Sequence, residues 1–259
     1  MVNIPRPALL LVAAALILPA AGCARNKVKG DTAYVARDVN TLYALAKKSA
    51  DKGDFAEAAK LFDEVERQHP YSLWARRAQL MSAFSYYMAQ QYTDSISSAQ
   101  RFVSIHPGNQ DAPYANYLIA MSYYQQIADV TRDQKITQQA SDAFNELMRR
   151  YPGSRYATDA RLKIDLINDH LAGKEMEVGR FYQRSGNWLA ASTRFRAVTD
   201  KYQTTSHAPE ALERLVECYL ALGVPEEATK AAAVLGRNYN GTPWYKHSYE
   251  MIRRYRPKS

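Results

Sequence analysis

A pattern that returns along most of the chain limits what this sequence can fold into. The segment GDFAEAAKLFDEVERQHPYS at residues 53–72 has a counterpart in QQYTDSISSAQRFVSIHPGN at residues 90–109, which lies 37 residues further on. In both copies fifteen positions separate an aromatic residue from a proline. Further copies occupy residues 135–154, 186–205 and 223–242, and the last of these is the least regular. A repeat of this period indicates supersecondary units that stack on their neighbours.

The spacing inside each copy predicts a helix with one apolar face. In the first copy Ala58, Phe62 and Val65 are four and three residues apart, so they share one face of a helix. The third and fourth copies carry similar residues at the same places, namely Ala140, Phe144, Leu147, Ala191, Phe195 and Val198. The small alanine lets the two helices of a hairpin approach, and the aromatic ring fills the space against the next hairpin.

Glycine and proline mark the predicted helix ends. Gly53, Gly186 and Gly223 each stand just before a repeat helix, where a residue of left-handed conformation commonly ends the preceding helix. Proline disfavours a helical conformation at the residue before it, and this separates one hairpin from the next. The prolines at these positions are Pro70, Pro107 and Pro152.

Two longer intervals interrupt the period. In one interval the extra residues fall near residues 127–135, which predicts a longer loop inside the third hairpin. In the other they fall in residues 154–185, a segment that contains no proline and has Gly173 and Gly179 as its internal glycines. A single helix of about thirty residues is the simplest interpretation, since nothing in this segment ends a helix.

The pattern resembles the tetratricopeptide repeat, whose period is about 34 residues. The second copy departs from it, with Ser95 and Ala99 at the small and aromatic places. We therefore predict an all-α fold, a tetratricopeptide-repeat solenoid of five helical hairpins with one long central helix. Residues 36–152 are expected to hold repeats 1–3, residues 153–242 the long helix with repeats 4–5, and residues 243–259 a basic C-terminal tail.

The first 22 residues have the features of an export signal. Arg6 precedes an apolar stretch of eleven residues, Ala8–Leu18, and the small residues at positions 20–22 lead directly to Cys23. Eleven helical residues rise only about 16 Å, roughly half of a ~30 Å hydrocarbon core, so a transmembrane helix is not expected. A secretory signal in which Cys23 is incidental is one alternative. Residues 23–35 are polar and aperiodic, which is typical of a tether.

The cysteine directly after small residues looks like a bacterial lipobox. This resemblance implies that residues 1–22 are removed as a lipoprotein signal peptide. Cys23 then carries a diacylglycerol on sulfur and a fatty acid such as palmitate on its amine, and several acyl chains together anchor a protein stably. The residue after Cys23 is Ala24 and not an aspartate. In this respect the sequence is similar to outer-membrane lipoproteins of enteric-type bacteria.

The sequence offers little that indicates catalysis. The five histidines lack the spacing of metal ligands, and Cys218 in ALERLVECYLALG is expected to be a small buried residue. No catalytic residue, metal or cofactor is therefore predicted, and the chain is not expected to be an enzyme. The formal net charge is +8, but the basic residues are spread along the chain, so nucleic acid is not expected as a partner.

Binding candidates are aromatic. Helix spacing suggests that Tyr86 and Tyr123 fill the core, while their neighbours face elsewhere. The first helices of such hairpins line the surface of a solenoid where extended peptides bind. The residues expected in a substrate-peptide groove are Tyr71, Trp74, Tyr87 and Tyr124. Arginines considered for a peptide carboxylate are Arg76, Arg77 and Arg101. The alternative is that all these aromatic residues serve packing.

The chain resembles the BamD family, lipoproteins of the outer-membrane β-barrel assembly machinery, in HPYSLWARRAQLMSAFSYY, DVTRDQ, RRYPGSRYATDARLKIDL and VGRFYQRSGNWLAAS. The resemblance covers nearly all of the mature chain. It implies a lipid anchor in the outer membrane, a position facing the periplasm and a non-enzymatic scaffold for insertion of β-barrel proteins. The implied partners are the periplasmic domains of BamA, other lipoproteins of the complex and unfolded outer-membrane proteins, which bind the N-terminal repeats.

The same resemblance implies roles for a few residues. Arg194 in GNWLAASTR matches the family's arginine that meets an acidic partner on BamA. The segment DVTRD matches a loop of the third repeat, which adds Asp129, Arg132 and Asp133 to the expected BamA contact. The family's N-terminal pocket maps onto Tyr71, Trp74 and Tyr87. A periplasmic repeat protein that organises cell-wall synthesis or cell division is the alternative, although such proteins often carry a coiled coil that is not visible here.

Overall fold

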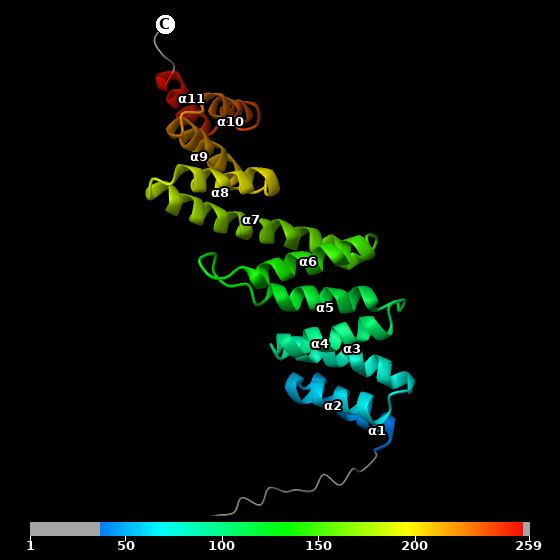
Figure 1. Cartoon of the computed structure of the whole chain (residues 1–259). Helices are drawn as coiled ribbons and strands as arrows, with labels where there is room; N and C mark the ends of the chain where they lie inside the picture. Colours follow the sequence, from blue (N-terminus) through cyan, green and yellow to red (C-terminus); the bar gives the residue numbers. More distant parts are fainter. Residues whose placement is uncertain (1–36, 256–259) are drawn as a thin grey trace, which may run out of the picture. The chain divides into compact units, whose positions relative to one another are not determined.

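Eleven α-helices form the regular structure of residues 37–255, the part of the chain that this computed structural model describes (Figure 1). Residues 1–22, Cys23 and the tether at residues 23–35 lie outside the described residues, so the predictions made for them stay predictions. Within residues 37–255 no helix combines the length and the apolar character needed to cross a membrane.

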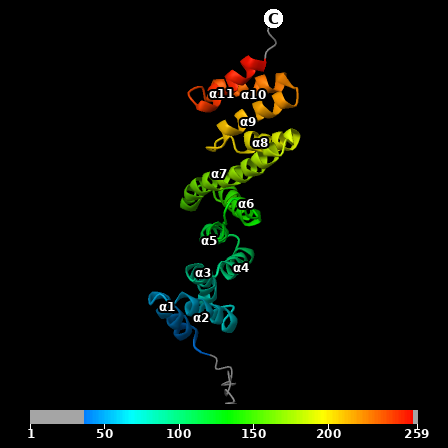
Figure 2. The same cartoon turned by 90° about the vertical axis from the view of Figure 1, so that its left-hand side faces the viewer.

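Ten of the eleven described helices pair into five hairpins, as the repeat predicts. The first two hairpins are α1 (Val39–Asp51) with α2 (Phe55–Gln68) and α3 (Leu73–Met88) with α4 (Tyr92–Ile105). The third and fourth are α5 (Ala112–Tyr124) with α6 (Lys135–Arg150) and α7 (Arg155–Arg184) with α8 (Trp188–Lys201). The fifth is α9 (Ala208–Ala221) with α10 (Pro225–Asn238), and α11 (Pro243–Tyr255) follows it. Each helix packs against the next one along the chain (Figure 2), which confirms the all-α repeat fold.

Side chains that accept hydrogen bonds from the backbone begin several of these helices. At the start of α3 the Ser72 Oγ accepts from the backbone N–H of Ala75 at 3.0 Å. A cap of this kind contributes about 1 kcal/mol, because it satisfies one of the unpaired N–H groups of the first turn. The other residues that cap in this way are Asp38, Asp54, Ser154 and Asn187.

The turns inside the hairpins need a backbone conformation that L-residues rarely adopt. Gly53, Gly186 and Gly223 have φ angles of +82°, +74° and +75°, which confirms the expected left-handed helix ends. The second hairpin holds Gln90 at the equivalent position, with a φ of +61°. A side chain in this region costs roughly 1–2 kcal/mol, so the second hairpin carries a strain that the others avoid.

The apolar cores repeat with the hairpins. Each of the first three cores contains both helices of one hairpin and the first helix of the next, and a phenylalanine of the second helix lies at its centre. Phe62, Phe144 and Phe195 are fully buried. In the second hairpin, where Ser95 and Ala99 replace the usual residues, Phe102 sits one turn later and supplies the missing ring.

The 30-residue helix α7 confirms the predicted long helix and spans about 45 Å. Its first half contributes Ala160 and Ile167 to the core around α6, and its second half contributes Ala172 and Met176 to the core around α8. One helix is therefore shared by two cores. Residues from Arg37 onward belong to one compact unit, so the two groups of repeats are joined by this helix and do not form separate bodies.

Helix α11 forms residues 243–255 of the segment 243–259, for which the sequence predicts a basic C-terminal tail. Pro243 stands in its first turn, where a missing N–H is not needed. Trp244, Tyr245 and Ile252 pack against the core formed by α7 to α10. Within residues 37–255 no hairpin follows the fifth, and α11 occupies the place that the first helix of a next hairpin would take. A terminal capping element of this kind is typical of repeat proteins.

The strain at Gln90 leads to a paired prediction. Gln90→Gly should raise the free energy of unfolding by up to about 1 kcal/mol, because the relief of strain exceeds the added freedom of the unfolded chain. Gly53→Ala should lower it by about 1 kcal/mol, since the new Cβ meets nothing within 4 Å and only the backbone responds. Urea unfolding followed by circular dichroism measures both. Equal destabilisation by the two variants would contradict this account.

Candidate functional sites: a cavity and a central surface

A cavity of about 910 Å³ lies between α3 and the turn that connects α4 with α5. Its apolar wall is formed by Leu80, Met81, Phe102 and Ile105. The turn contributes residues 106–111, which follow the proline-marked end of the second hairpin. Arg76 and Arg77 line the cavity from α3, so a cationic group and an apolar wall face the same space.

The charge in this cavity comes mainly from α3. The Arg77 guanidinium lies 5.6 Å from the centre of the Trp74 ring, and that ring is 4.5 Å from the ring of Tyr43. Burial raises the pKa of Tyr43 although Arg77 acts in the opposite direction. Arg101 is not part of the cavity lining, because it pairs with Glu66 at 3.2 Å. Arg76 and Arg77 are thus the arginines placed to meet an anionic group.

The lining of this cavity combines an apolar wall with a few polar groups. Concave sites with an apolar lining and a few placed polar groups bind side chains and orient them. A guanidinium adds a fork of donors that matches a carboxylate. Sequence reasoning did not identify Tyr43 and Ile105 as part of the cavity lining. The proline turn near residue 107, which forms one side of the cavity, was the signal that pointed to this region.

The four aromatic residues predicted for a groove lie in different surroundings. Tyr71 is fully exposed at the turn before α3, whereas Trp74 packs against the core of the first hairpin. Tyr87 packs on the second core, and its hydroxyl accepts from Gln125 Nε2 at 3.1 Å. Tyr124 packs on the third core. Three of these side chains therefore pack on three successive cores, Tyr71 is exposed, and none of the four belongs to the cavity lining.

The two tyrosines at the end of α3 differ from the sequence expectation. Tyr86 was expected in the core, but its hydroxyl donates to Asp63 Oδ2 at 2.6 Å in a partly buried polar contact. Its neighbour Tyr87 packs on the apolar cluster. The reason lies in α2, whose Asp63 provides an acceptor that only a residue on that side of α3 can reach. Tyr123 packs on the second and third cores, as expected.

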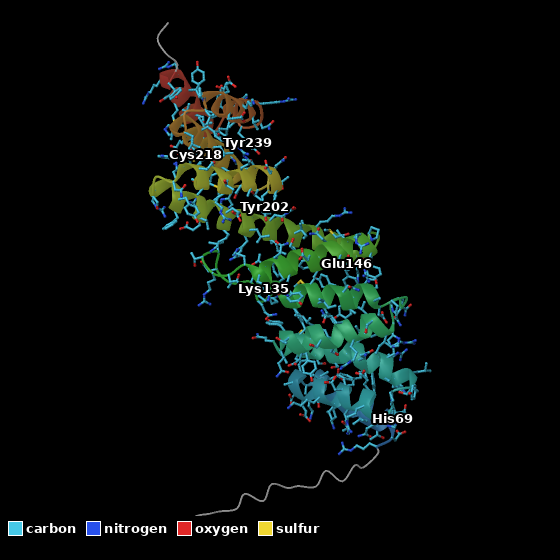
Figure 3. All side chains as sticks on the ribbon, viewed as in Figure 1. His69, Lys135, Glu146, Tyr202, Cys218 and Tyr239 are labelled. Carbon is cyan, nitrogen blue, oxygen red and sulfur yellow. The ribbon has the colours of Figure 1, made fainter. Side chains whose placement is uncertain are left out.

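The predicted loop of the third hairpin connects α5 to α6, ending at Lys135 (Figure 3). The Asp129 carboxylate accepts from the backbone N–H of Thr131 at 2.8 Å and from its hydroxyl at 2.7 Å. These bonds, the backbone one foremost, lower the pKa of Asp129. Lys174 of α7 donates to the Thr131 carbonyl at 2.9 Å. The loop is thus held on α7, with Arg132 and Asp133 exposed beside it.

Arg194 of α8 contacts α7 next to the same place. Its Nη1 lies 3.2 Å from Glu175 Oε2, and its side chain remains 45% exposed. Glu175 follows Lys174, the residue that holds the loop, directly in the chain. The structure therefore brings the predicted loop and the predicted arginine together at two adjacent residues of α7. We call Asp129, Arg132, Asp133, Glu175 and Arg194 the central surface.

Two histidines and the buried cysteine of the described residues make contacts that serve packing and structure. The His69 Nε2 lies 2.7 Å from the carbonyl of Arg37, and the His106 ring packs against Phe102 with a centroid distance of 5.3 Å. Cys218 is fully buried in α9 (Figure 3), and burial raises the pKa of its thiol to about 12. A neutral, inaccessible thiol is a packing group and not a nucleophile.

Comparison with known proteins gives consistent relatives. A family model described as an outer membrane lipoprotein (YfiO) matches residues 35–235. The outer membrane protein assembly factor BamD of Caulobacter vibrioides is 50% identical over 95% of this chain and 81% of its own length. The protein of that name from Rickettsia prowazekii is 43% identical over 90% of this chain and 92% of its own length. A solved tetratricopeptide-repeat protein of Thermus thermophilus is 16% identical, with a TM-score of 0.38, over 83% of this chain and 99% of that one.

Stacked helical hairpins and a matching lipoprotein family together define a helical-repeat protein of the outer-membrane lipoprotein class. Within that class, the relatives that are 50% and 43% identical over most of the sequence are both BamD proteins. The chain belongs to the BamD family. This favours the assembly interpretation of the sequence over the cell-wall alternative.

Proposed function

We propose that this chain is a non-enzymatic, lipid-anchored scaffold for the assembly of β-barrel proteins in the outer membrane. Its relatives are assembly factors of outer-membrane proteins, and it takes part in the same process. The observation that supports the scaffold role is the presence of two separate surfaces on one compact unit of stacked hairpins. The cavity belongs to the second hairpin, and the central surface to the third and fourth.

The site of action follows from the family. The chain is an outer-membrane lipoprotein that faces the periplasm. Cys23 is the residue that would carry the lipid, because it stands directly after the apolar signal-like stretch. An anchor of this kind confines both surfaces to the membrane, where weak contacts act at a high effective concentration.

The anchor can be tested with the two cysteines of the chain. Cys23→Ser should remove the protein from the outer-membrane fraction, because the acyl chains that hold it there cannot be attached. Cys218→Ser is the matched control, since it changes the other cysteine and should leave the distribution as it is. Membrane fractionation and mass spectrometry of the N-terminal peptide give the readout. Recovery of the serine variant at position 23 in the outer membrane at the normal level would argue against the anchor.

The central surface supports a contact with the periplasmic domains of BamA. Arg194 is the cation that an acidic partner group would meet, and Arg132 and Asp133 are exposed on the loop that Lys174, the residue before Glu175, holds on α7. Glu175 holds the guanidinium while keeping it partly exposed, so the donor is oriented before a partner arrives. Pre-orientation lowers the entropy cost of a charge-assisted contact. The hairpin of α7 and α8 also exposes Phe181 and Leu189, which add apolar area.

Exchange of charges at this surface should change the affinity for BamA in a defined way. Arg194→Glu should weaken association at least about tenfold, since it replaces the attractive charge by a repulsive one. Glu175→Gln should bind as well as the wild type or better, because it releases Arg194 from its internal partner. Arg149→Glu on α6 is the control for net charge. Biolayer interferometry with the BamA periplasmic domains measures all three, and equal affinity of Arg194→Glu and Arg149→Glu would refute the contact.

The cavity is the part of the N-terminal repeats that we assign to unfolded outer-membrane proteins. Its apolar wall accepts side chains of an extended segment, while Arg76 and Arg77 meet a carboxylate. The aromatic residues Tyr71, Trp74, Tyr87 and Tyr124 remain proposed contacts for the continuation of the chain along the hairpins. Trp74 supports this role indirectly, since its ring underlies the Arg77 guanidinium.

The cavity assignment predicts loss of peptide binding from two different changes. Arg77→Glu should weaken binding of a peptide from an unfolded β-barrel protein about tenfold through charge, and Ile105→Asp should do so through the apolar wall. Arg254→Glu, at an exposed arginine of α11, controls for net charge. Fluorescence anisotropy with a labelled peptide provides the affinities. If Arg77→Glu and Arg254→Glu weaken binding by the same factor and Ile105→Asp does not weaken it, the effect comes from net charge and the cavity is not the site.

A further inference from the structure

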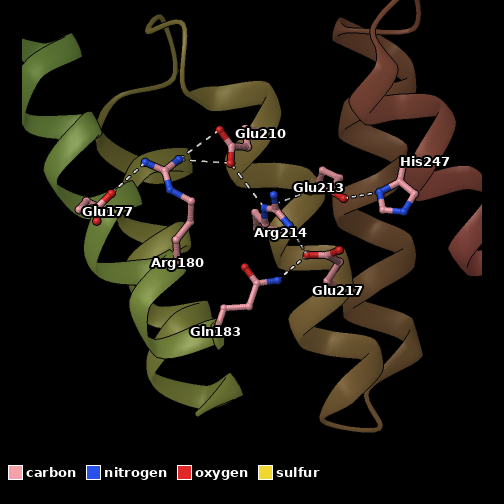
Figure 4. A network of polar contacts seen from close by, with 8 residues as sticks. All are labelled: Glu177, Arg180, Gln183, Glu210, Glu213, Arg214, Glu217 and His247. Carbon is pink, nitrogen blue, oxygen red and sulfur yellow. Dashed lines mark hydrogen bonds and ion pairs between the residues drawn. The ribbon is translucent and has the colours of Figure 1, made fainter. Parts of the chain in front are cut away.

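A polar network joins three helices near the C-terminus (Figure 4). Arg180 of α7 contacts Glu177 and Glu210, and Arg214 of α9 contacts Glu210, Glu213 and Glu217. Gln183 donates to Glu217, and His247 of α11 contacts Glu213. Four carboxylates thus share two guanidinium groups, which leaves a net charge of −2 when His247 is neutral. The network attracts a further cation.

Glu213 is the residue whose buried position most favours a further cation. Its side chain is 1% exposed, and its Oε1 lies 2.5 Å from His247 Nδ1. Its Oε2 is buried without a hydrogen bond, and the Nε of Arg214 is 3.5 Å away. An ionised carboxylate buried with one oxygen unsatisfied costs several kcal/mol unless a charge compensates it. The Glu213 carboxylate also forms a group with the side chains of Glu217 and His247, each of which offers one ligand atom.

The geometry points to a binding site for a divalent transition-metal ion, with Zn²⁺ as the expected occupant, formed by Glu213, Glu217 and His247. Each residue offers a ligand atom, and the three atoms lie within 4.8 Å of one another. One imidazole nitrogen and two carboxylate oxygens are a ligand set that suits zinc and leaves a fourth position for water. A divalent ion also balances the net charge of the surrounding network.

The remaining network residues act as supports for these ligands. Arg214 and Gln183 both contact Glu217 through Oε2, which fixes the orientation of its carboxylate. Outer contacts of this kind commonly orient metal ligands. In a tetrahedral site with bonds of about 2.0–2.2 Å, ligand atoms lie about 3.3 Å apart, so His247 must withdraw from Glu213 by less than about 1 Å. Its side chain is 56% exposed and has room for this movement.

A bound ion would fasten the capping helix to the last hairpin. Glu213 and Glu217 belong to α9, whereas His247 belongs to α11. Without the ion, α11 is held mainly by partly buried apolar side chains such as Trp244 and Ile252. Sequence reasoning predicted no metal here because His247 has no partner of metal-ligand type four residues away in its own helix. The site appears only when α11 packs on α9.

Titration of the full-length lipoprotein in detergent, after treatment with a chelator, tests the proposal with Zn²⁺ alone as the probe. Isothermal titration calorimetry should show one site per chain. His247→Ala and Glu217→Gln should each lower the zinc affinity at least tenfold, because each removes one of three ligands. His207→Ala is the matched control, since His207 faces a single carboxylate, Asp169, at 3.8 Å. Its zinc affinity should equal that of the wild type.

Hydrogen exchange supplies a second readout that does not depend on calorimetry. Zinc should slow the amide exchange of α11 in the wild type and leave it unchanged in His247→Ala. Absence of zinc binding, or equal binding by His247→Ala and the wild type, would overturn the proposal. If His247→Ala lowers the melting temperature by the same amount with and without zinc, the contact is a hydrogen bond only, and the proposal is also wrong.

Discussion

The whole structure depends on the inability of one hairpin to bury its own apolar face. Each of the first three cores needs both helices of a hairpin and the first helix of the next, with a phenylalanine between them. A buried phenylalanine contributes about 2–3 kcal/mol, and this gain is available only when the next hairpin is in place. Each hairpin is therefore stabilised by its interfaces with the neighbouring hairpins, as in other repeat proteins. The same constraint explains α11, which covers a fifth hairpin that has no successor.

Helix α7 meets this constraint in a different way from the other helices. It serves as the next first helix for the third hairpin and as the partner of α8 in the fourth, so its two halves lie in two cores. The second role requires close approach at Gly179, where an added Cβ would come within 2.5 Å of the Phe195 ring. The length of α7 leaves its middle free to hold the loop of the third hairpin and the arginine of α8. The central surface is a consequence of this sharing.

Local patterns predicted the parts of the fold that local chemistry determines. Left-handed glycines end helices wherever they occur, so Gly53, Gly186 and Gly223 identified their turns correctly. The long helix and the loop before α6 followed from an altered spacing of the same signals. What failed depends on contacts between distant segments. Tyr86 turns toward Asp63 of another helix, and α11 becomes a helix because the last core is open, so neither could be derived from the spacing of nearby residues.

The central surface lies where the repeat is broken, and this suggests how a scaffold gains a specific site. A regular stack presents the same outer face at each repeat, so it offers little that distinguishes one position from another. The cavity uses the proline turn after the second hairpin, a turn that the regular repeat provides, whereas the central surface uses the inserted loop and the elongated α7. The zinc ligands that we propose lie where the stack ends. Because every core couples to the next, ordering α11 at that end would also restrain α9, whose core includes the second half of α7. The last hairpin and the central surface are therefore linked through the same packing that forms the fold.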